Sequence, residues 1–336
     1  MITFDDVVKV YPGGGTAVDH VSLEVPTGKT TVFVGPSGCG KTTSLRMINR
    51  MISPTSGRVL IDGQDVAGQD EALLRRGIGY VIQHAGLFPH RTVLDNVATV
   101  PVLLGKTRRE ARAAALGLLE RVGLAPEFAQ RYPAQLSGGQ QQRVGVARAL
   151  AADPPIMLMD EPFSAVDPVV REGLHREFLR LQKDLGKTIA MVTHDIDEAI
   201  KLGDLVVIFR QGGIVAQIGT PQELLSDPAD EFVAEFVGRD RGLRSLSFDT
   251  AAELPVKPVP AELVVDEAGR PLGWRTGADD VRPTGGTFTS ADTLRLVADL
   301  AILSPVGIAV RVDADGKADG ITPHHDLADY LAARRG

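Results

Sequence analysis

The sequence contains very little cysteine and few aromatic residues. Cys39 and Trp274 are the single members of their types among 336 residues, and aromatic side chains make up 5% of the chain. One cysteine excludes a disulfide framework within the chain, and such cysteine usage is typical of reducing compartments. We therefore expect a cytoplasmic protein that is stabilised by an apolar core.

Long apolar runs and an excess of basic residues are missing as well. Apolar stretches such as 205–209 and 156–159 are far shorter than the roughly 20 residues that cross a bilayer. No charged and then apolar leader opens the sequence, so we expect no export. The net charge of −7 disfavours nucleic acid as a partner, because proteins that bind it normally carry a basic face. If the protein works at a membrane, it must do so through a partner.

The length and the apolar pattern predict two domains of the α/β class. A chain of 336 residues exceeds the usual single-domain size. In residues 1–240, short apolar and β-branched segments alternate with segments of helical spacing, which predicts a parallel sheet covered by helices. The predicted strands are 2–11, 17–25, 30–34, 58–63, 78–83, 156–159, 189–193, 205–209 and 214–218, and the predicted helices are 41–51, 108–122, 140–152, 169–185 and 196–201.

The composition changes twice along the chain. Between about 84 and 152, Leu, Ala, Arg and Glu dominate with helical spacing, which predicts a helical insertion in the first domain. Residues 241–260 end in a proline-rich stretch and are expected to form a linker. Residues 261–336 predict a small αβ module, with strands at 262–266, 307–312 and 319–322 and helices at 290–303 and 325–333.

Residues 35–43, GPSGCGKTT, follow a predicted strand and open a predicted helix. This is the P-loop arrangement, in which glycines let backbone N–H groups curl around phosphate oxygens. Lys41 adds a full charge for the β- and γ-phosphates, and the Thr42 hydroxyl is placed to ligate Mg²⁺. A chance glycine turn is the competing interpretation, which the flanking strand and helix disfavour. The predicted nucleotide-binding residues of this loop are Gly35, Pro36, Ser37, Gly38, Cys39 (expected to be an inert filler), Gly40, Lys41, Thr42 and Thr43.

The apolar segment 156–159 is followed by two carboxylates, Asp160 and Glu161. In open α/β sheets, ligands bind at the carboxyl ends of the strands. Mg²⁺ usually keeps several waters, so we expect Asp160 to hold the ion through one of them. Glu161 is then free to polarise the water that attacks the γ-phosphate. By themselves the two acids fit a helix cap before Pro162 equally well, and it is the P-loop that favours catalysis.

Three further side chains are candidates for the same site. Gln83 follows a predicted strand and offers an amide that senses the γ-phosphate or the metal. His194 follows strand 189–193 and offers a donor to the γ-phosphate. Tyr11 precedes a glycine turn and is placed to stack on adenine, although aromatic residues at strand ends also serve plain packing.

A second anion-binding motif, LSGGQ, lies about a hundred residues after the first. Ser137, Gly138, Gly139 and Gln140 open a predicted helix, and a helix N-terminus attracts anions. One chain cannot use both motifs on one phosphate group unless they are brought together.

These motifs together resemble the ATP-binding subunits of ABC transporters over roughly the first 240 residues. The resemblance implies a P-loop ABC ATPase domain with a parallel sheet core, an antiparallel β subdomain and the helical insertion. It implies ATP and Mg²⁺ as ligands and a homodimer in which the signature LSGGQ of one subunit closes on ATP held by the other. The implied catalytic residues are Lys41, Gln83, Glu161 and His194, and the implied metal ligands are Thr42, Gln83 and Asp160.

The resemblance extends to partners. Asp167 resembles the loop that crosses the dimer interface, and the insertion resembles the subdomain that grips a membrane permease. Leu87, Phe88 and Pro89 form an apolar patch suited to that permease, with internal packing as the alternative. We therefore expect a peripheral protein on the cytoplasmic face of the cell membrane.

Three phrases resemble one subfamily: QHAGLFPHRTV, MINRMISPTSG and GLRSLSF are similar to importers of glycine betaine, proline, choline and carnitine. Such importers also depend, indirectly, on an extracytoplasmic solute-binding protein. An importer of methionine or polyamines, and a soluble regulatory ATPase without a permease, remain alternatives. Residues 290–332 resemble one cystathionine-β-synthase-type (CBS) motif and 262–274 the remnant of a shortened copy, which implies a regulatory module.

Overall fold

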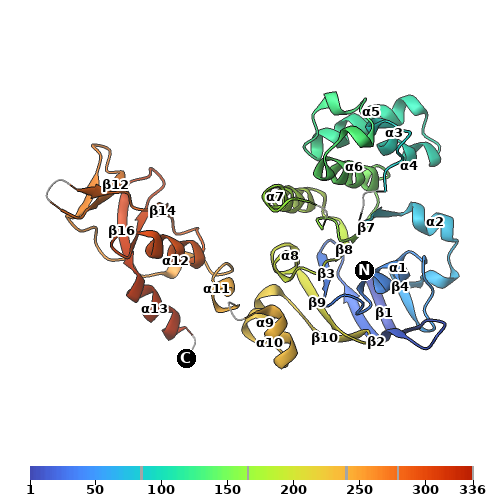
Figure 1. Cartoon of the computed structure of the whole chain (residues 1–336), viewed down its shortest axis with the longest axis horizontal. Coiled ribbons are helices and arrows are strands. Elements are labelled where there is room, and N and C mark those ends of the chain that lie inside the picture. The colour runs from blue at the N-terminus through green and yellow to red at the C-terminus, as the bar shows by residue number, and fades with distance from the viewer. Residues whose placement is uncertain (84–85, 165, 239–240, 278–279, 335–336) are drawn as a thin grey trace. The chain divides into compact units, whose positions relative to one another are not determined.

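The structure is a computed structural model that describes residues 1–83, 86–164, 166–238, 241–277 and 280–334. The chain divides into two compact units, Met1–Val237 and Gly238–Gly336 (Figure 1). Residue 84, the predicted start of the helical insertion, and residue 240, the predicted end of the first domain, lie outside the described residues.

A six-stranded sheet in the order β10-β9-β3-β8-β7-β6 forms the centre of the first unit. Five strands run parallel, and β10 pairs antiparallel with β9, so the predicted parallel sheet is confirmed except at this edge. All five residues of β3 are buried, as expected for a strand covered on both faces. The strands are β3 Thr30–Val34, β6 Ile78–Val81, β7 Ile156–Asp160, β8 Thr188–Val192, β9 Leu205–Arg210 and β10 Ile214–Gly219.

The two faces of this sheet carry different layers. Phe33 packs with α1 and a second, antiparallel sheet of order β2-β1-β4-β5. Val32 and Val34 pack on the other side with α7 to α10, because successive side chains of a strand point to opposite faces. The bounds are β1 Ile2–Val10, β2 Thr16–Val25, β4 Ser56–Ile61, β5 Gln64–Asp65, α1 Lys41–Ile48, α2 Glu71–Arg76, α7 Pro168–Leu185, α8 Ile196–Leu202, α9 Pro221–Ser226 and α10 Glu231–Val237.

The predicted insertion is a helical subdomain with its own apolar core. Figure 1 shows its helices grouped together in green. They are α3 Val93–Val97, α4 Thr99–Leu103, α5 Arg108–Arg121 and α6 Gly138–Leu150. Within the predicted patch, Leu87 packs against this core, whereas Phe88 is 39% exposed and lies under the Arg91 guanidinium. Leu87 therefore packs internally, whereas Phe88 remains accessible to a partner.

The second unit contains two three-stranded sheets, β11-β12-β13 and β14-β15-β16. Residues of the predicted linker belong to its core, because Leu246, Ala251 and Leu254 are buried with Phe288 and Leu294. The predicted linker at 241–260 thus supplies apolar side chains to the core of the second unit. The elements are α11 Arg241–Ser245, β11 Leu263–Val265, β12 Pro271–Arg275, β13 Val281–Arg282, β14 Thr287–Phe288, α12 Leu294–Leu303, β15 Ile308–Val312, β16 Ala318–Pro323 and α13 His324–Ala333.

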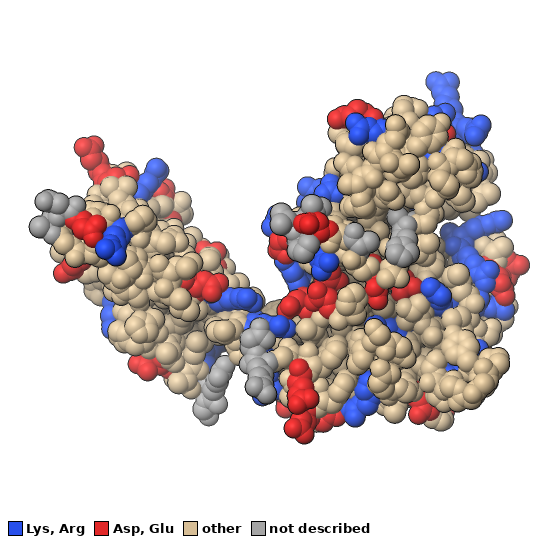
Figure 2. Space-filling view, viewed as in Figure 1, with Lys and Arg blue, Asp and Glu red and all other residues tan. Residues whose placement is uncertain are grey.

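The surface carries charge of both signs. Figure 2 shows acidic and basic side chains intermixed over each unit on the face that it draws. Among the described residues, none of the helices combines the length and the apolar character that a membrane span requires.

Candidate functional site

A cavity of about 630 Å³ lies against the P-loop in the first unit. Its volume is in the range of ordinary ligand pockets. The P-loop forms one wall, the turn after β1 and the start of β2 form another, and Glu161 completes the lining. The lining residues are Tyr11, Pro12, Gly13, Gly15, Thr16, Ala17, Ser37, Gly38, Cys39, Gly40, Lys41, Thr42, Thr43 and Glu161.

Two P-loop glycines are required by close backbone contacts. A Cβ at Gly40 would lie 1.9 Å from the carbonyl oxygen of Ala17, and one at Gly35 would lie 2.3 Å from that of Phe209. Gly40 also has φ +94°, a left-handed conformation that glycine adopts without strain. It is the N-cap of α1 and makes no side-chain cap bond. The N–H groups of the first turn are thus presented to the cavity without a side chain of the cap competing for them.

Lys41 is held by its own loop. Its Nζ donates to the carbonyl oxygens of Gly35 at 2.7 Å and Pro36 at 2.8 Å, and the side chain is 6% exposed. Cys39 Sγ lies 3.6 Å from the same ammonium. Burial raises the pKa of the Cys39 thiol, which keeps it protonated and fits an inert loop filler.

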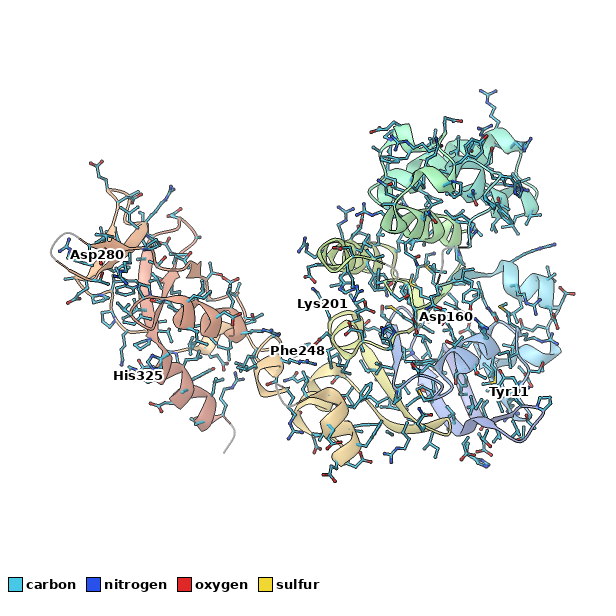
Figure 3. All side chains as sticks on the ribbon, in the orientation of Figure 1. Tyr11, Asp160, Lys201, Phe248, Asp280 and His325 are labelled. Atoms are coloured by element: carbon cyan, nitrogen blue, oxygen red, sulfur yellow. The ribbon has the colours of Figure 1, made fainter. Side chains whose placement is uncertain are left out.

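Asp160, at the end of β7, joins three elements. Its Oδ1 accepts a hydrogen bond from Thr42 Oγ1 at 2.8 Å. Its Oδ2 accepts from Arg46 Nη2 at 3.3 Å and from Tyr80 OH at 3.5 Å. Figure 3 shows Asp160 inside the first unit where β7 ends. The P-loop threonine and the carboxylate of β7 thus meet as the sequence predicts.

Arg46 and Tyr80 belong to the same charge cluster. Burial raises the pKa of Tyr80. The neighbouring Asp160 charge raises this pKa too, whereas the Arg46 guanidinium lowers it without cancelling the rise. The hydrogen bond to Tyr80 and the nearby Asp160 carboxylate raise the pKa of Arg46. The cluster therefore consists of a carboxylate, a guanidinium and a neutral phenol.

Glu161 has an unusual backbone. Its φ is +47°, which places a non-glycine residue in the left-handed region, at a cost of roughly 1–3 kcal/mol. The backbone is held by Glu161 N–H donating to Val192 O at 2.9 Å, and its carbonyl accepts from Ser164 Oγ at 3.0 Å. Strain of this kind persists where surrounding contacts impose it.

The Glu161 carboxylate meets two of the other candidates. Gln83 Nε2 donates to Glu161 Oε2 at 2.9 Å, and His194 Nδ1 lies 3.4 Å from the same oxygen. Residues from the ends of β6, β7 and β8 therefore converge on one carboxylate at the cavity, as expected for the carboxyl edge of a parallel sheet.

Tyr11 lines the cavity from the turn that follows β1. Its side chain is 40% exposed, its OH is 3.5 Å from Thr43 Oγ1, and the Lys9 ammonium lies 5.3 Å from its ring centre. Figure 3 shows it on the loop that follows β1. One ring face thus contacts a cation, and the phenol is tied to the P-loop helix.

The signature residues are separate from this cavity. Ser137 is the N-cap of α6, and its Oγ accepts from Gln140 N–H at 3.3 Å. In return Gln140 Oε1 accepts from Ser137 N–H at 3.0 Å, a complete capping box. Ser137 and Gly138 are exposed. The structure brings the predicted P-loop, the two acids after β7, Gln83 and His194 together. It leaves Ser137 to Gln140 outside this set.

Three residues at the site were not predicted from the sequence. Arg46 lies four residues after Thr42 on α1, so helical spacing alone indicates that it shares the Thr42 face. Tyr80 lies on β6 beside Asp160, and strand pairing is not visible in the sequence. Gln211 donates from the β9–β10 turn to Ser37 O at 3.0 Å, a contact that no local pattern indicates.

The oxygen atoms gathered here suit Mg²⁺. A hard cation prefers a hydroxyl, carboxylates and amide carbonyls, and Thr42, Asp160 and Gln83 supply these groups. In the part of the chain that the structure describes, no cluster of three or more His, Cys, Asp or Glu side chains forms a metal site. Such a cluster is not needed for an ion that is held chiefly by phosphates and waters.

Fold and site together define a P-loop nucleotide-binding protein. A family model described as "ABC transporter" matches residues 18–164. The choline transport ATP-binding protein OpuBA of Bacillus subtilis is 54% identical over 249 residues, which are 74% of this chain and 65% of the relative. The osmoprotectant import ATP-binding protein OsmV of Salmonella typhimurium is 45% identical over 352 residues, covering 95% and 92%. The chain belongs to the ABC transporter family of ATP-binding, ATP-hydrolysing proteins.

Solved structures match a large part of the chain. A dimeric post-hydrolysis state of the ATP-binding cassette MJ0796 with ADP and phosphate is 35% identical with a TM-score of 0.60, and the match covers 66% of this chain and 99% of the other. The protein cbiO1 of Clostridium perfringens, part of the cbiONQ transporter complex, is 26% identical with a TM-score of 0.64 and coverages of 74% and 94%.

Proposed function

We propose that this protein hydrolyses ATP at the P-loop cavity to energise uptake of quaternary-amine osmolytes through a membrane permease. The reaction is attack of water on the γ-phosphorus, with cleavage of the bond to the bridging oxygen of ADP. Lys41 binds the β- and γ-phosphate oxygens, and Tyr11 stacks on adenine. The observation that carries the hydrolytic step is the Glu161 carboxylate, which borders the cavity and lies within 3.4 Å of His194 and 2.9 Å of Gln83.

Glu161 is the general base in this proposal. Its carboxylate accepts a hydrogen bond from the attacking water, and the proton passes to it as the bond to phosphorus forms. Gln83 donates to Glu161 through its nitrogen, which leaves its carbonyl oxygen for other partners. His194 donates a hydrogen bond from its ring to the γ-phosphate. The chain thus supplies an acceptor for the attacking water and a donor to the phosphate that the water attacks.

Thr42, Asp160 and Gln83 would hold Mg²⁺. The ion supplies charge neutralisation for the phosphates. Arg46 and Tyr80 orient the Asp160 carboxylate toward α1 through the hydrogen bonds described above. Their contribution is positional, because each contacts Oδ2 while Thr42 contacts Oδ1.

Hydrolysis is proposed to require a second copy of the chain. The signature at the start of α6 is exposed and does not line the cavity of its own chain. A head-to-tail homodimer brings Ser137 and Gly138 of one copy to the γ-phosphate bound by the other. The matched ATP-binding cassette MJ0796 is a dimer with ADP and phosphate, which supports this arrangement.

The cargo is inferred from the relatives. Their names describe choline transport and osmoprotectant import, and the proposed class is glycine betaine, choline, carnitine and proline. The partners are permease subunits and, indirectly, an extracytoplasmic solute-binding protein. The proposed location is the cytoplasmic face of the cell membrane, where the helical subdomain and exposed Phe88 contact the permease.

The second unit is proposed to be a CBS-like regulatory module. Its elements β14, α12, β15, β16 and α13 form one β-α-β-β-α unit. The described residues between β11 and β13 form a small antiparallel sheet instead. Removing the whole of Gly238–Gly336 is expected to spare ATP hydrolysis and to alter its response to salt. Loss of hydrolysis on this truncation would make the module structural.

Uptake of labelled choline, glycine betaine and proline by cells with and without the gene tests the transport proposal. Glu161→Gln cells serve as the control for expression without turnover. Uptake that depends on the gene but not on Glu161 would contradict energisation by this site. If the protein hydrolyses ATP but uptake does not depend on the gene, a regulatory ATPase is favoured.

A further inference from the structure

A buried carboxylate lies directly behind the catalytic edge. Glu198, on α8, is 4% exposed. Burial opposes its ionisation, but the neighbouring His175 ring, a hydrogen bond from Thr193 and the positive charge of Arg171 keep its pKa below the ordinary value. Glu198 is therefore charged at neutral pH, which requires its partners to be well placed.

One oxygen of Glu198 holds the turn that carries His194. Thr193 Oγ1 donates to Glu198 Oε2 at 2.7 Å. Asp195 N–H in turn donates to Thr193 Oγ1 at 3.1 Å. The Thr193 hydroxyl thus links the residues before and after His194 to the buried Glu198 carboxylate. His194 Nδ1 in turn lies 3.4 Å from Glu161 Oε2.

The other oxygen faces α7, which follows the loop of Asp167. Glu198 Oε1 lies 3.4 Å from His175 Nε2 and 3.9 Å from Arg171 Nε. Arg171 Nη2 donates to the carbonyl oxygen of Val166 at 3.1 Å, and Arg171 N–H donates to that of Asp167 at 2.8 Å. The same carboxylate is therefore linked to the loop that precedes α7.

His175 connects the cluster to a third segment. Its ring packs edge-on against Phe163 with 4.8 Å between ring centres, and Phe163 is two residues after Glu161. Glu198 is thus linked to Thr193 directly, to the segment of Phe163 through His175, and to the loop of Val166 and Asp167 through Arg171. An apolar residue would fill the space with less desolvation cost, so stability alone does not account for a charge here.

We propose that Glu198 is a positioning residue, which acts through Thr193 to hold His194 at the γ-phosphate and through Arg171 to hold the loop at Asp167. This inference rests on the proposed ATPase function and deepens it. A displacement of His194 of about 1 Å is enough to slow a positioned reaction by up to about a hundredfold. The nucleotide itself is bound by the P-loop, so its affinity is independent of Glu198.

The test compares variants of the full chain by kcat, by KM for ATP, by Kd for ATP and by Tm. Thr193→Val and Glu198→Gln are expected to lower kcat about tenfold and to leave KM and Kd within twofold. Thr193→Ser retains the hydroxyl and is expected to retain kcat. The matched control is Glu120→Gln, at an exposed position of α5 in the helical subdomain, far from the cluster in the chain.

A double-variant cycle separates positioning from folding. In the His194→Ala background, adding Thr193→Val is expected to cause no further loss, because the hydroxyl acts through His194. A further tenfold loss, or a lower Tm with unchanged kcat in the single variants, would overturn the inference. If His194→Ala by itself retains full turnover, the assignment of His194 in the proposed function fails instead. Should Glu198→Gln not fold, Thr193→Val and Thr193→Ser decide the question alone.

Discussion

The chain contains two glycine-rich helix N-termini that look alike in sequence and differ in structure. At α1 the N-cap is Gly40, which has no side chain, and the first turn lines a cavity of about 630 Å³. At α6 the N-cap is Ser137, which exchanges hydrogen bonds with Gln140, and Ser137 and Gly138 are exposed outside that cavity. The first end is suited to bind phosphate within its own chain. The second is a preformed, rigid end that is suited to meet phosphate presented by another molecule.

If hydrolysis is stopped, the N-terminus of α1 in one copy and the N-terminus of α6 in its partner should stay bound to the same ATP. Glu161→Gln removes the base but keeps the side-chain volume, so kcat is expected to fall about a thousandfold with ATP affinity unchanged. Light scattering should then show an ATP-dependent dimer. Normal turnover in this variant would remove Glu161 from the role of base, and a trapped monomer with bound ATP would contradict the use of both ends.

Removing the charge at the α1 end should affect binding itself. Lys41→Ala is expected to weaken ATP affinity about a hundredfold, or about 2.7 kcal/mol, because the ammonium is the full positive charge of the P-loop. Equilibrium binding of a fluorescent ATP analogue measures this. Lys106→Ala, at an exposed position of the helical subdomain, is the control. Equal affinities of the two variants would mean that the α1 end does not bind the phosphates.

Altering the α6 end should affect hydrolysis without affecting binding. Ser137→Ala removes the hydroxyl that we propose contacts the γ-phosphate across the dimer, and it is expected to lower kcat about tenfold, as for the loss of one hydrogen bond to a charged group. The Kd of ATP for the monomer should stay within twofold. A weakened Kd would place the signature in the same pocket as the P-loop and would end the distinction between the two helix ends.

The smallest effect is expected at Gln140. Its side chain serves the capping box of α6, so Gln140→Ala should lower the free energy of unfolding by about 1 kcal/mol and change kcat less than threefold. Urea denaturation and steady-state kinetics measure the two quantities. A large loss of kcat with unchanged stability would show that Gln140 contacts nucleotide directly, as its place in the LSGGQ motif predicts.

The local motifs of the first unit were readable because each depends on neighbouring residues. Strand, glycine loop and helix follow one another between Thr30 and Ile48, so the P-loop is complete within twenty residues. The meeting of Thr42 with Asp160 follows from the rule that parallel strands present their carboxyl ends at one edge. Arg46, Tyr80 and Gln211 were missed because their partners are set by packing and strand pairing.

In the second unit, several features could not be predicted from local sequence patterns. Its main helices and three strands were predicted, but the burial of Leu246, Ala251 and Leu254 was not. A proline-rich stretch indicates an absence of regular structure, and it carries no information on whether apolar side chains beside it find a core. Strands β13 and β14 have two residues each, which is too short for an alternating pattern to indicate a strand.

By itself the sequence determined the P-loop, the order of strands and helices, and the chemistry available at the ends of β6, β7 and β8. Those features arise from neighbouring residues and from the two regular periodicities of the backbone. Only the tertiary structure decided that Glu161 adopts a left-handed backbone, that Gln140 faces its own helix cap, and that Glu198 joins three segments behind the site. Each of these depends on groups far apart in the chain, whose distances are fixed when the core packs.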